Sequence, residues 1–167
     1  MNVKEIGNGG KKMKMINRKS TKEEVMESVR KNGKALAYAS KALKADREVV
    51  MEAVKQNVDA LQYASDELRN DKEIVLEAVR DDGWALRYAS DELRNDKEIV
   101  LESMKNTHFA FQFASQELQG NREVVLEAVK QNGVGMKYAS FDETLHSTIE
   151  EKEDIEALRK ELDKLYR

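Results

Sequence analysis

A string of fifteen residues occurs twice in the chain, at 63–77 and at 88–102, and it reads YASDELRNDKEIVLE both times. The two copies begin 25 residues apart. Looser copies keep this spacing on both sides, as Tyr38-Ala-Ser upstream and as Phe113-Ala-Ser and Tyr138-Ala-Ser downstream. A fixed period of this length is typical of stacked-repeat proteins, in which each repeat packs against its neighbours.

The composition agrees with thin helical layers. Charged residues make up 37% of the chain and aromatic residues only 6%, which fits layers with much solvated surface better than a thick globular core. The chain has no cysteine, so a disulfide or a thiolate metal site is excluded. No apolar run approaches the roughly 20 residues of a membrane span, and the first residues lack the apolar region of a signal peptide. We therefore expect an intracellular, cytoplasmic protein.

Five repeats without insertions account for most of the chain, at residues 21–45, 46–70, 71–95, 96–120 and 121–145. Each begins with a side chain suited to cap a helix N-terminus, namely Thr21, Asp46, Asp71, Asp96 and Asn121. The apolar stripe that follows predicts a first helix of about ten residues. A second helix begins near the recurring motif Ala-Leu-x-Tyr-Ala-Ser. The sequence thus predicts an all-α solenoid of five 25-residue paired-helix repeats.

Two local features of the repeat have specific interpretations. Gly33, Gly83 and Gly133 fit the left-handed position that commonly follows the last residue of a helix. The recurring serine either bonds back to a carbonyl within one continuous second helix, or it caps a separate short turn. We favour a continuous or slightly kinked second helix. This serine row comprises Ser40, Ser65, Ser90, Ser115 and Ser140.

The two ends of the chain depart from the repeat. Residues 1–20 are rich in Gly, Asn and Lys, and we predict a basic, disordered N-terminal arm. Residues 146–167 contain a capping box at Ser147 and Glu150 and a heptad-spaced apolar stripe, which predict an amphipathic helix that caps the last repeat. We expect a monomer; a coiled-coil dimer through residues 147–167 is the alternative.

The repeat signature, V-V-x-E-A-V followed by N-G-x-A-L-x-Y-A-S-x-E-L-R-N-D-K-E, resembles the short helical repeats of the family called domain of unknown function 4116. Residues 21–140 carry this resemblance. It implies a helical-repeat fold and no catalytic residue. The sequence departs from the pattern where Val58 and His108 replace the glycine between the helices, and after Ser140, where the Glu-Leu-Arg-Asn end of the repeat is missing.

Residues with catalytic or metal-binding chemistry are sparse. His108 and His146 are the only imidazoles, and neither has a second ligand at zinc-site spacing. The serine row has no recurring base beside it, so we assign it to backbone hydrogen bonding. The carboxylates Glu27, Glu52, Glu77, Glu102 and Glu127 stand three residues before a Lys or Arg and read as a solvated, paired face. We therefore predict no catalytic, cofactor or metal site.

The row of aromatic residues at the start of each Tyr-Ala-Ser motif has a structural interpretation. The rings are nearly invariant, and residues 21–140 hold 18 bases against 22 acids. Readers of single-stranded RNA vary their base-contacting residues and carry positive charge along the groove. We interpret the row as a packing ladder between layers. It comprises Tyr38, Tyr63, Tyr88, Phe113 and Tyr138.

A binding surface should lie where the repeats differ from one another. The position after the glycine between the helices changes from charged to large and apolar along the chain: Lys34, Asp59, Trp84, Phe109 and Val134. Trp84 and Phe109 either fill the turn between helices or form an exposed hot spot for a protein partner. A second variable row would frame such a patch; its members include Arg87, Gln112 and Lys137.

We interpret the chain as a non-catalytic scaffold that binds a protein partner through Trp84, Phe109, Arg87, Gln112 and Lys137. Nucleic-acid binding through the basic arm, residues 1–20, is the alternative of another class, and it predicts an affinity that falls steeply with salt. A structural spacer within a larger assembly is the third interpretation. We expect a protein partner in preference to nucleic acid, and no membrane partner.

Overall fold

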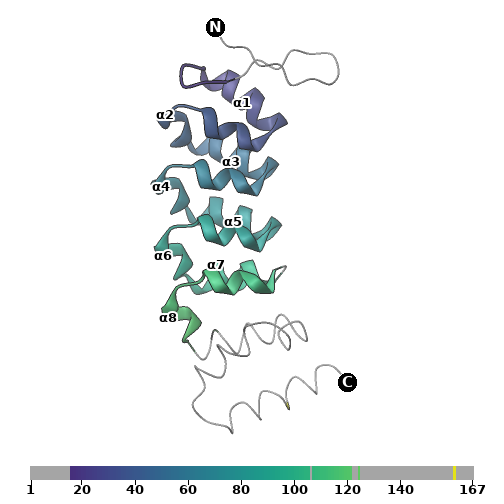
Figure 1. Cartoon of the computed structure of the whole chain (residues 1–167), viewed down its shortest axis with the longest axis vertical. Coiled ribbons are helices and arrows are strands. Elements are labelled where there is room, and N and C mark those ends of the chain that lie inside the picture. Colours follow the sequence, from purple (N-terminus) through teal and green to yellow (C-terminus); the bar gives the residue numbers. More distant parts are fainter. Residues whose placement is uncertain (1–15, 106, 122–123, 125–159, 161–167) are drawn as a thin grey trace. The chain divides into compact units, whose positions relative to one another are not determined.

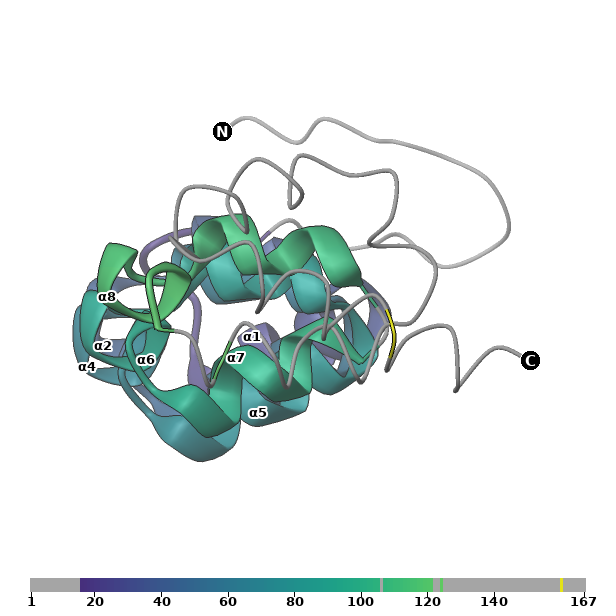
Figure 2. The same ribbon diagram turned by 90° about the horizontal axis from the view of Figure 1, so that it is seen from below.

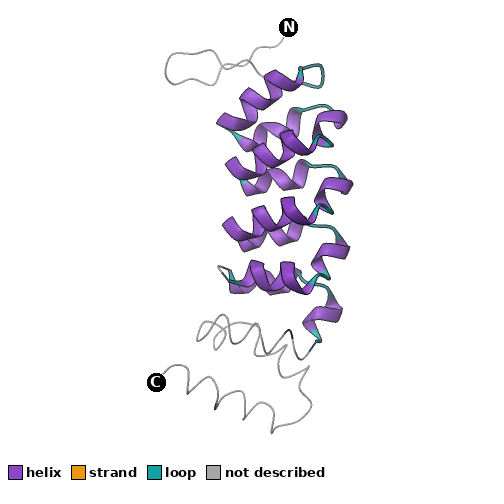
Figure 3. Ribbon diagram, turned by 180° about the vertical axis from the view of Figure 1, so that it is seen from behind, coloured by secondary structure: helices purple, strands orange, loops and turns teal. Residues whose placement is uncertain are grey.

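The structure is a computed structural model that describes residues 16–105, 107–121, 124 and 160. The chain divides into two compact units, Met1–Ile74 and Val75–Arg167. Every element of the described residues is a helix (Figure 3). No helix among them is long and apolar enough to cross a membrane.

Three elements recur in the same order along the chain. They are an α-helix of eight to ten residues, a 3-10 helix of six residues and an α-helix of four residues. In the first unit these are α1 (Lys22–Lys31), η1 (Gly33–Tyr38), α2 (Lys41–Lys44), α3 (Arg47–Gln56), η2 (Val58–Tyr63) and α4 (Asp66–Arg69). Helix α5 (Lys72–Asp81) begins in the first unit and continues into the second. There it is followed by η3 (Gly83–Tyr88), α6 (Asp91–Arg94), α7 (Lys97–Met104), η4 (His108–Phe113) and α8 (Gln116–Gln119).

The predicted N-caps of the first helices are confirmed. Thr21 Oγ1 accepts from the Glu24 N–H, and the Glu24 carboxylate accepts from the Thr21 N–H, which completes a capping box. Asp46 Oδ1 accepts from the N–H groups of Glu48 and Val49 at 3.1 and 3.2 Å. Asp71, Asp96 and Asn121 accept backbone N–H groups in the same way.

The predicted continuous second helix is wrong. The segment is a 3-10 helix that ends at the aromatic residue, followed by an extended Ala-Ser pair and a separate short α-helix. Ser40 has φ −63° and ψ 160°, and its Oγ accepts from the Leu43 N–H at 3.2 Å, so it caps α2. Ser65, Ser90 and Ser115 cap the next three short helices in the same way. The serine side chain caps the short helix and does not lie inside a continuous one, because the cap gives a hydrogen-bond acceptor to an N–H group at the helix N-terminus that has none within the helix.

The left-handed conformation predicted for Gly33 and Gly83 is also wrong, since neither has a positive φ. The preceding residue is extended instead, and its side chain caps the 3-10 helix: Asn32 has φ −154°, and its Oδ1 accepts from the Lys34 N–H at 3.1 Å. Glycine is required here by a close approach. A Cβ on Gly33 would lie 2.3 Å from the Ala53 carbonyl oxygen, and one on Gly83 would lie 2.0 Å from that of Ser103. Gly133 lies outside the described residues.

Within the first unit, α1 packs on α3 and η1 packs on η2, so that one repeat forms one layer (Figure 1). The core between the two rows is aliphatic and fully buried; it includes Val25, Val29, Leu36, Val49, Val54 and Leu61. In the second unit α7 packs against η3 and η4. Figure 2 shows these 3-10 helices on the side of the unit opposite α5 and α7, with the short helices along one edge. The two short helices of this unit each bury one leucine, Leu93 on α6 and Leu118 on α8.

Ion pairs join neighbouring layers at both ends of the first helices. In the first unit, Lys22 Nζ lies 2.9 Å from Asp46 Oδ2 and 2.7 Å from Glu48 Oε2. Arg47 repeats this arrangement with Asp71 and Glu73. At the other helix end, Arg30 pairs with Glu52 across layers at 3.2 Å, and in the second unit Arg80 pairs with Glu102 at 3.5 Å. The sequence predicted ion pairs within one helix, and of these the Glu102–Lys105 pair is confirmed at 2.6 Å.

Residues 16–20, the last five of the predicted N-terminal arm, are described and include a turn. Asn17 and Ser20 close a turn in which the Ser20 N–H donates to the Asn17 carbonyl at 2.9 Å. Ile16 before this turn is buried, with 8% of its surface exposed. Residues 16–20 thus cover the start of the first layer. Residues 1–15, most of the fifth repeat and the predicted C-terminal helix lie outside the described residues, apart from Asn121, Val124 and Lys160.

We predict that Gly83→Ala destabilises the protein strongly, because its Cβ would overlap a backbone carbonyl that cannot move without shifting α7. The expected loss is about 2–3 kcal/mol of unfolding free energy, in the range of overpacked cores. Urea unfolding followed by Trp84 fluorescence measures it. Gly120→Ala is the matched control, because its Cβ would meet nothing nearer than 3.4 Å and its φ is −88°. An equal loss in both variants would contradict the close-approach explanation.

We predict that Asp46→Asn reduces stability at neutral pH but not in acid. Asparagine keeps the N-cap acceptor and removes the charge that binds Lys22. The hydrogen bond from Lys22 lowers the pKa of Asp46 below its ordinary value of 3.8 in the folded protein, so its contribution is present above that pH and is lost as the pH falls through the folded value. The expected difference is up to about 1 kcal/mol at pH 7. Urea unfolding followed by circular dichroism from neutral pH to below about pH 4 tests this; a constant difference contradicts it.

Candidate functional site

Four of the five residues of the sequence-predicted patch lie on the two 3-10 helices of the second unit. Trp84 and Arg87 are on η3, and Phe109 and Gln112 are on η4. Side chains three residues apart eclipse one another on a 3-10 helix, so each helix presents its pair on one face. All four are exposed, Trp84 by 37% and Phe109 by 46%. Lys137 lies outside the described residues.

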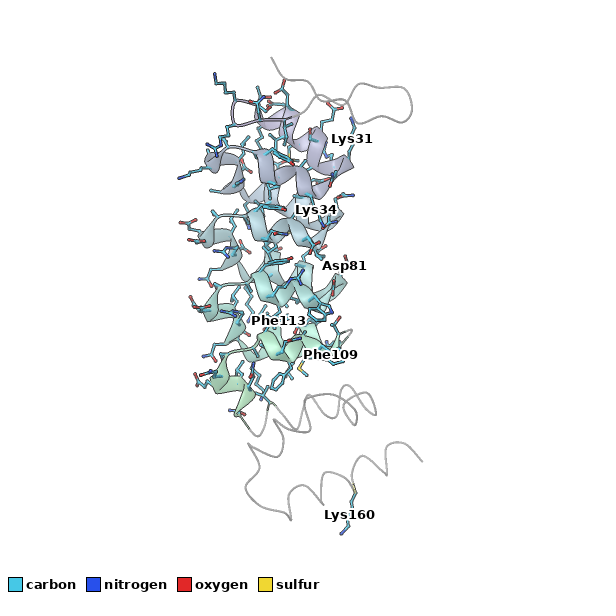
Figure 4. All side chains as sticks on the ribbon, in the orientation of Figure 1. Lys31, Lys34, Asp81, Phe109, Phe113 and Lys160 are labelled. Carbon is cyan, nitrogen blue, oxygen red and sulfur yellow. The ribbon has the colours of Figure 1, made fainter. Side chains whose placement is uncertain are left out.

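Local sequence fixes which face of η3 and η4 points outward. Asp82 caps η3 by accepting the Trp84 N–H at 2.9 Å, which starts the helix at a defined residue. The next two residues, Ala85 and Leu86, are 1% and 0% exposed, so they turn Trp84 and Arg87 away from the core. In η4, buried Ala110 and Phe111 have the same effect on Phe109 and Gln112; Figure 4 labels Phe109 and Phe113 on this helix.

Trp84 is partly packed and partly exposed, so it combines the two roles that the sequence left open, a packing residue and an exposed contact for a partner. Its ring packs edge-on against Phe113 of the next layer, with centroids 5.3 Å apart and an interplanar angle of 60°. Edge-to-face pairs of this kind add packing energy beyond the area they bury. The remaining surface of the ring is exposed. Trp84 is therefore anchored on one side and accessible on the other, which is the geometry of a preorganised aromatic contact.

The polar members of the patch are also held in place. The Arg87 guanidinium carbon lies 4.6 Å from the centroid of the Tyr88 ring, and the guanidinium donates to the Tyr88 hydroxyl. The Gln112 side-chain amide donates to the Phe109 carbonyl at 3.0 Å. The cation and the amide thus keep defined positions beside Trp84 and Phe109.

The same column of positions is polar in the first unit. Lys34, which corresponds to Trp84, pairs with Asp59, which corresponds to Phe109, at 2.8 Å (Figure 4 labels Lys34). This pair shows that the column aligns in adjacent layers of a unit. The second unit has Trp84 and Phe109 where the first unit has this Lys–Asp pair. The layers stack in both units, but the surface at these positions is an ion pair in the first and two accessible rings in the second.

The predicted aromatic ladder is not uniform. Tyr63, Tyr88 and Phe113 are half-buried, whereas Tyr38 is 61% exposed. In the second unit, Trp84 of one layer covers Phe113 of the next. Among the described residues, no layer precedes the one that contains Tyr38. Sequence reasoning treated the row as equivalent and missed Tyr38, although its place in the first repeat could have indicated the difference.

Carboxylates near the helix ends are committed to structural contacts. Lys105 and Arg80 lower the pKa of Glu102 against the opposing effect of burial. Within the described ranges, no group of three or more His, Cys, Asp or Glu side chains is arranged to hold a metal ion. The side chain of His108 is not described, and His146 lies outside the described residues.

The comparisons with known proteins give one family and no individual relative. A family model described as "Domain of unknown function (DUF4116)" matches the chain four times, at residues 21–69, 46–94, 71–119 and 96–143. Each match spans two repeats, and successive matches begin one repeat apart. The resemblance seen in the sequence is thereby confirmed. No curated protein and no solved structure matches the chain.

We predict that iodide quenches Trp84 fluorescence, but less than it quenches free tryptophan, because one side of the ring is covered by Phe113. Phe113→Ala should increase the quenching and shift the emission to longer wavelength. Tyr63→Ala, which changes the same position in another repeat, is the control and should leave the spectrum unchanged. A fully protected Trp84, or one indifferent to Phe113→Ala, would contradict the described packing.

Proposed function

Since this chain belongs to the domain of unknown function 4116 family, we propose that it uses the family's helical repeats as a non-catalytic scaffold for binding a protein. The repeats stack into a solenoid of five paired layers, and the C-terminal segment covers the last layer. Binding occurs through the aromatic patch, defined as Trp84, Arg87, Phe109 and Gln112, with Lys137 at its border.

The accessible rings of Trp84 and Phe109 are the observation that carries this proposal. Large aromatic side chains and arginine are enriched in the centres of protein interfaces, whereas monomer surfaces seldom display them together. The patch is preorganised, because Phe113 supports Trp84 and Tyr88 supports Arg87. Preorganised contacts lose little side-chain entropy on binding, so a small patch supplies a large share of the affinity.

The difference between the two units at these positions indicates that Trp84 and Phe109 have a role other than stabilising the stack. In the first unit the Lys34–Asp59 pair occupies this column, and the layers pack without aromatic rings at these two positions. Stacking alone therefore does not require Trp84 or Phe109. Exposed rings oppose solubility, so their retention is better explained by a partner that covers them.

Site-specific photo-crosslinking tests the proposal. A benzophenone amino acid at Phe109 should crosslink to a protein in cells that naturally express the chain, and Trp84→Ala should abolish that product. The same amino acid at Gln62, an exposed position of η2, is the control. The crosslinked protein is then purified and its affinity for the full chain measured by calorimetry.

Truncation of one buried aromatic contact typically weakens binding by about 2 kcal/mol or more. Trp84→Ala and Phe109→Ala should therefore each lower the affinity of the purified partner by roughly 30-fold or more. Gln62→Ala should have no effect. Unchanged affinity in both aromatic variants would exclude the aromatic patch as the interface.

A further inference from the structure

The positive charge of the described residues is concentrated in the first layer. Residues 16–45 contain eight bases and three acids, whereas residues 46–70 contain three bases and six acids. Residues 21–140 as a whole contain more acids than bases, and this total hides the excess of bases in the first layer. The first layer is therefore the part of the repeats whose charge suits an anionic partner.

Four of these eight bases form ion pairs with described residues, and four do not. Lys22, Arg30, Lys31 and Lys34 each pair with a carboxylate. The remaining four form no ion pair with any described residue and constitute what we call the basic edge: Arg18, Lys19, Lys41 and Lys44. Their charge is not neutralised by the contacts that hold the layers together.

The fold gathers these four cations at one place. Arg18 and Lys19 lie in the turn that leads into α1, and Lys41 and Lys44 lie on α2, which leads into α3. Helices α1 and α3 pack side by side, and Lys22 Nζ near the start of α1 is 2.9 Å from Asp46, the N-cap of α3. The two segments therefore lie at the same end of adjacent helices, and Figures 1 and 3 show them along one edge of the unit.

The acids at this edge offset only part of its charge. Lys22 binds both Asp46 and Glu48, so one negative charge of these two carboxylates is left over. Glu23 and Glu24 in the first turn of α1 add two more, and a hydrogen bond from its own backbone N–H lowers the pKa of exposed Glu23. Three negative charges therefore stand against the four cations. Helix α4 is the equivalent of α2 in the second layer, and it begins with two acids, Asp66 and Glu67. The basic edge therefore does not continue into the second layer.

An accessible aromatic ring precedes Lys41 of the basic edge by three positions. Tyr38 ends η1 and is 61% exposed, the largest exposure of the large apolar residues among the described positions. Two residues lie between it and Lys41, so the two backbones are at most about 10 Å apart along the chain. Cations that track a backbone, together with an aromatic ring on which a base stacks, are the elements of single-stranded nucleic-acid binding.

We propose that the first layer is a docking site for single-stranded nucleic acid, in which the basic edge contacts phosphates and Tyr38 stacks on a base. The exposed ring favours nucleic acid over an acidic protein segment, which needs only the cations. The proposed site consists of described residues; the sequence before it also contains Lys11, Lys12 and Lys14, which lie outside the described residues. The site is independent of the aromatic patch, which is on the second unit, so either proposal stands without the other.

The test is fluorescence anisotropy of the full chain with a labelled uridine or thymidine oligonucleotide of about 20 nucleotides. Affinity should fall with salt, and the slope of log affinity against log salt should become about 1.4 less steep in Lys41→Glu/Lys44→Glu, because each phosphate contact on a single strand contributes about 0.7. Tyr38→Ala should weaken binding by roughly 5- to 100-fold with the slope unchanged, since stacking releases no counterion. Tyr38→Phe should retain binding.

A matched control separates the basic edge from general charge. Lys55→Glu/Lys160→Glu makes the same change in net charge at two exposed lysines outside the edge, and it should bind much more tightly than Lys41→Glu/Lys44→Glu. Circular dichroism confirms that each variant is folded. Equal loss in the two double variants would overturn the proposal.

Two further outcomes would also overturn it. If polyglutamate competes as well as unlabelled oligonucleotide and Tyr38→Ala has no effect, the edge binds anions of any kind. If replacing Lys11, Lys12 and Lys14 by Gln abolishes binding while Lys41→Glu/Lys44→Glu leaves it intact, the N-terminal segment alone binds the nucleic acid. Retained binding after the Gln substitutions, with sensitivity to Tyr38 and Lys41, supports the site.

Discussion

In the first and third layers, the first residue of the 3-10 helix lies against a carbonyl oxygen of the next layer, and this contact limits the spacing of the two layers. At Gly33 and Gly83 this approach leaves no room for a Cβ. The same proximity lets Gln56 of the second layer reach back, where its side-chain oxygen accepts the Gly33 N–H and its amide nitrogen lies 3.5 Å from the Lys31 carbonyl. The next layer thus satisfies polar groups at the end of α1 that the helix itself leaves without partners.

The ion pairs and the variable surface both follow from that spacing. With α1 and α3 in contact, a cation at the second position of one repeat meets the acids at the first and third positions of the next, as Lys22 meets Asp46 and Glu48. Exposed pairs of this kind contribute little stability singly, but they favour one alignment of the layers. Positions such as Lys34 and Trp84 lie outside the close contact, so they can change from charged to aromatic while the layers remain stacked.

The repeat period, the helix N-caps and the helical class could be predicted from the sequence because each depends on local spacing. Asp46 and its equivalents cap helices whatever surrounds them. The division of the second helix was mispredicted because a serine can serve a helix interior or an N-cap, and only the backbone at Ala39 and Ser40 decides between them. The role of Gly33 was mispredicted because glycine is compatible with both a positive φ and a close approach, and the carbonyl that requires it is twenty residues away.

The candidate surfaces were partly predictable for the same reason. Differences between aligned repeats identified Trp84 and Phe109 without any coordinates, since a residue that breaks a repeat is not explained by the repeat. The basic edge was not visible in this way, because Lys41 and Lys44 resemble other surface lysines until their lack of an ion-pair partner among the described residues is known. In a protein whose layers are joined by recurring contacts, a charge or a ring that these contacts do not use is therefore more informative about binding than its residue type.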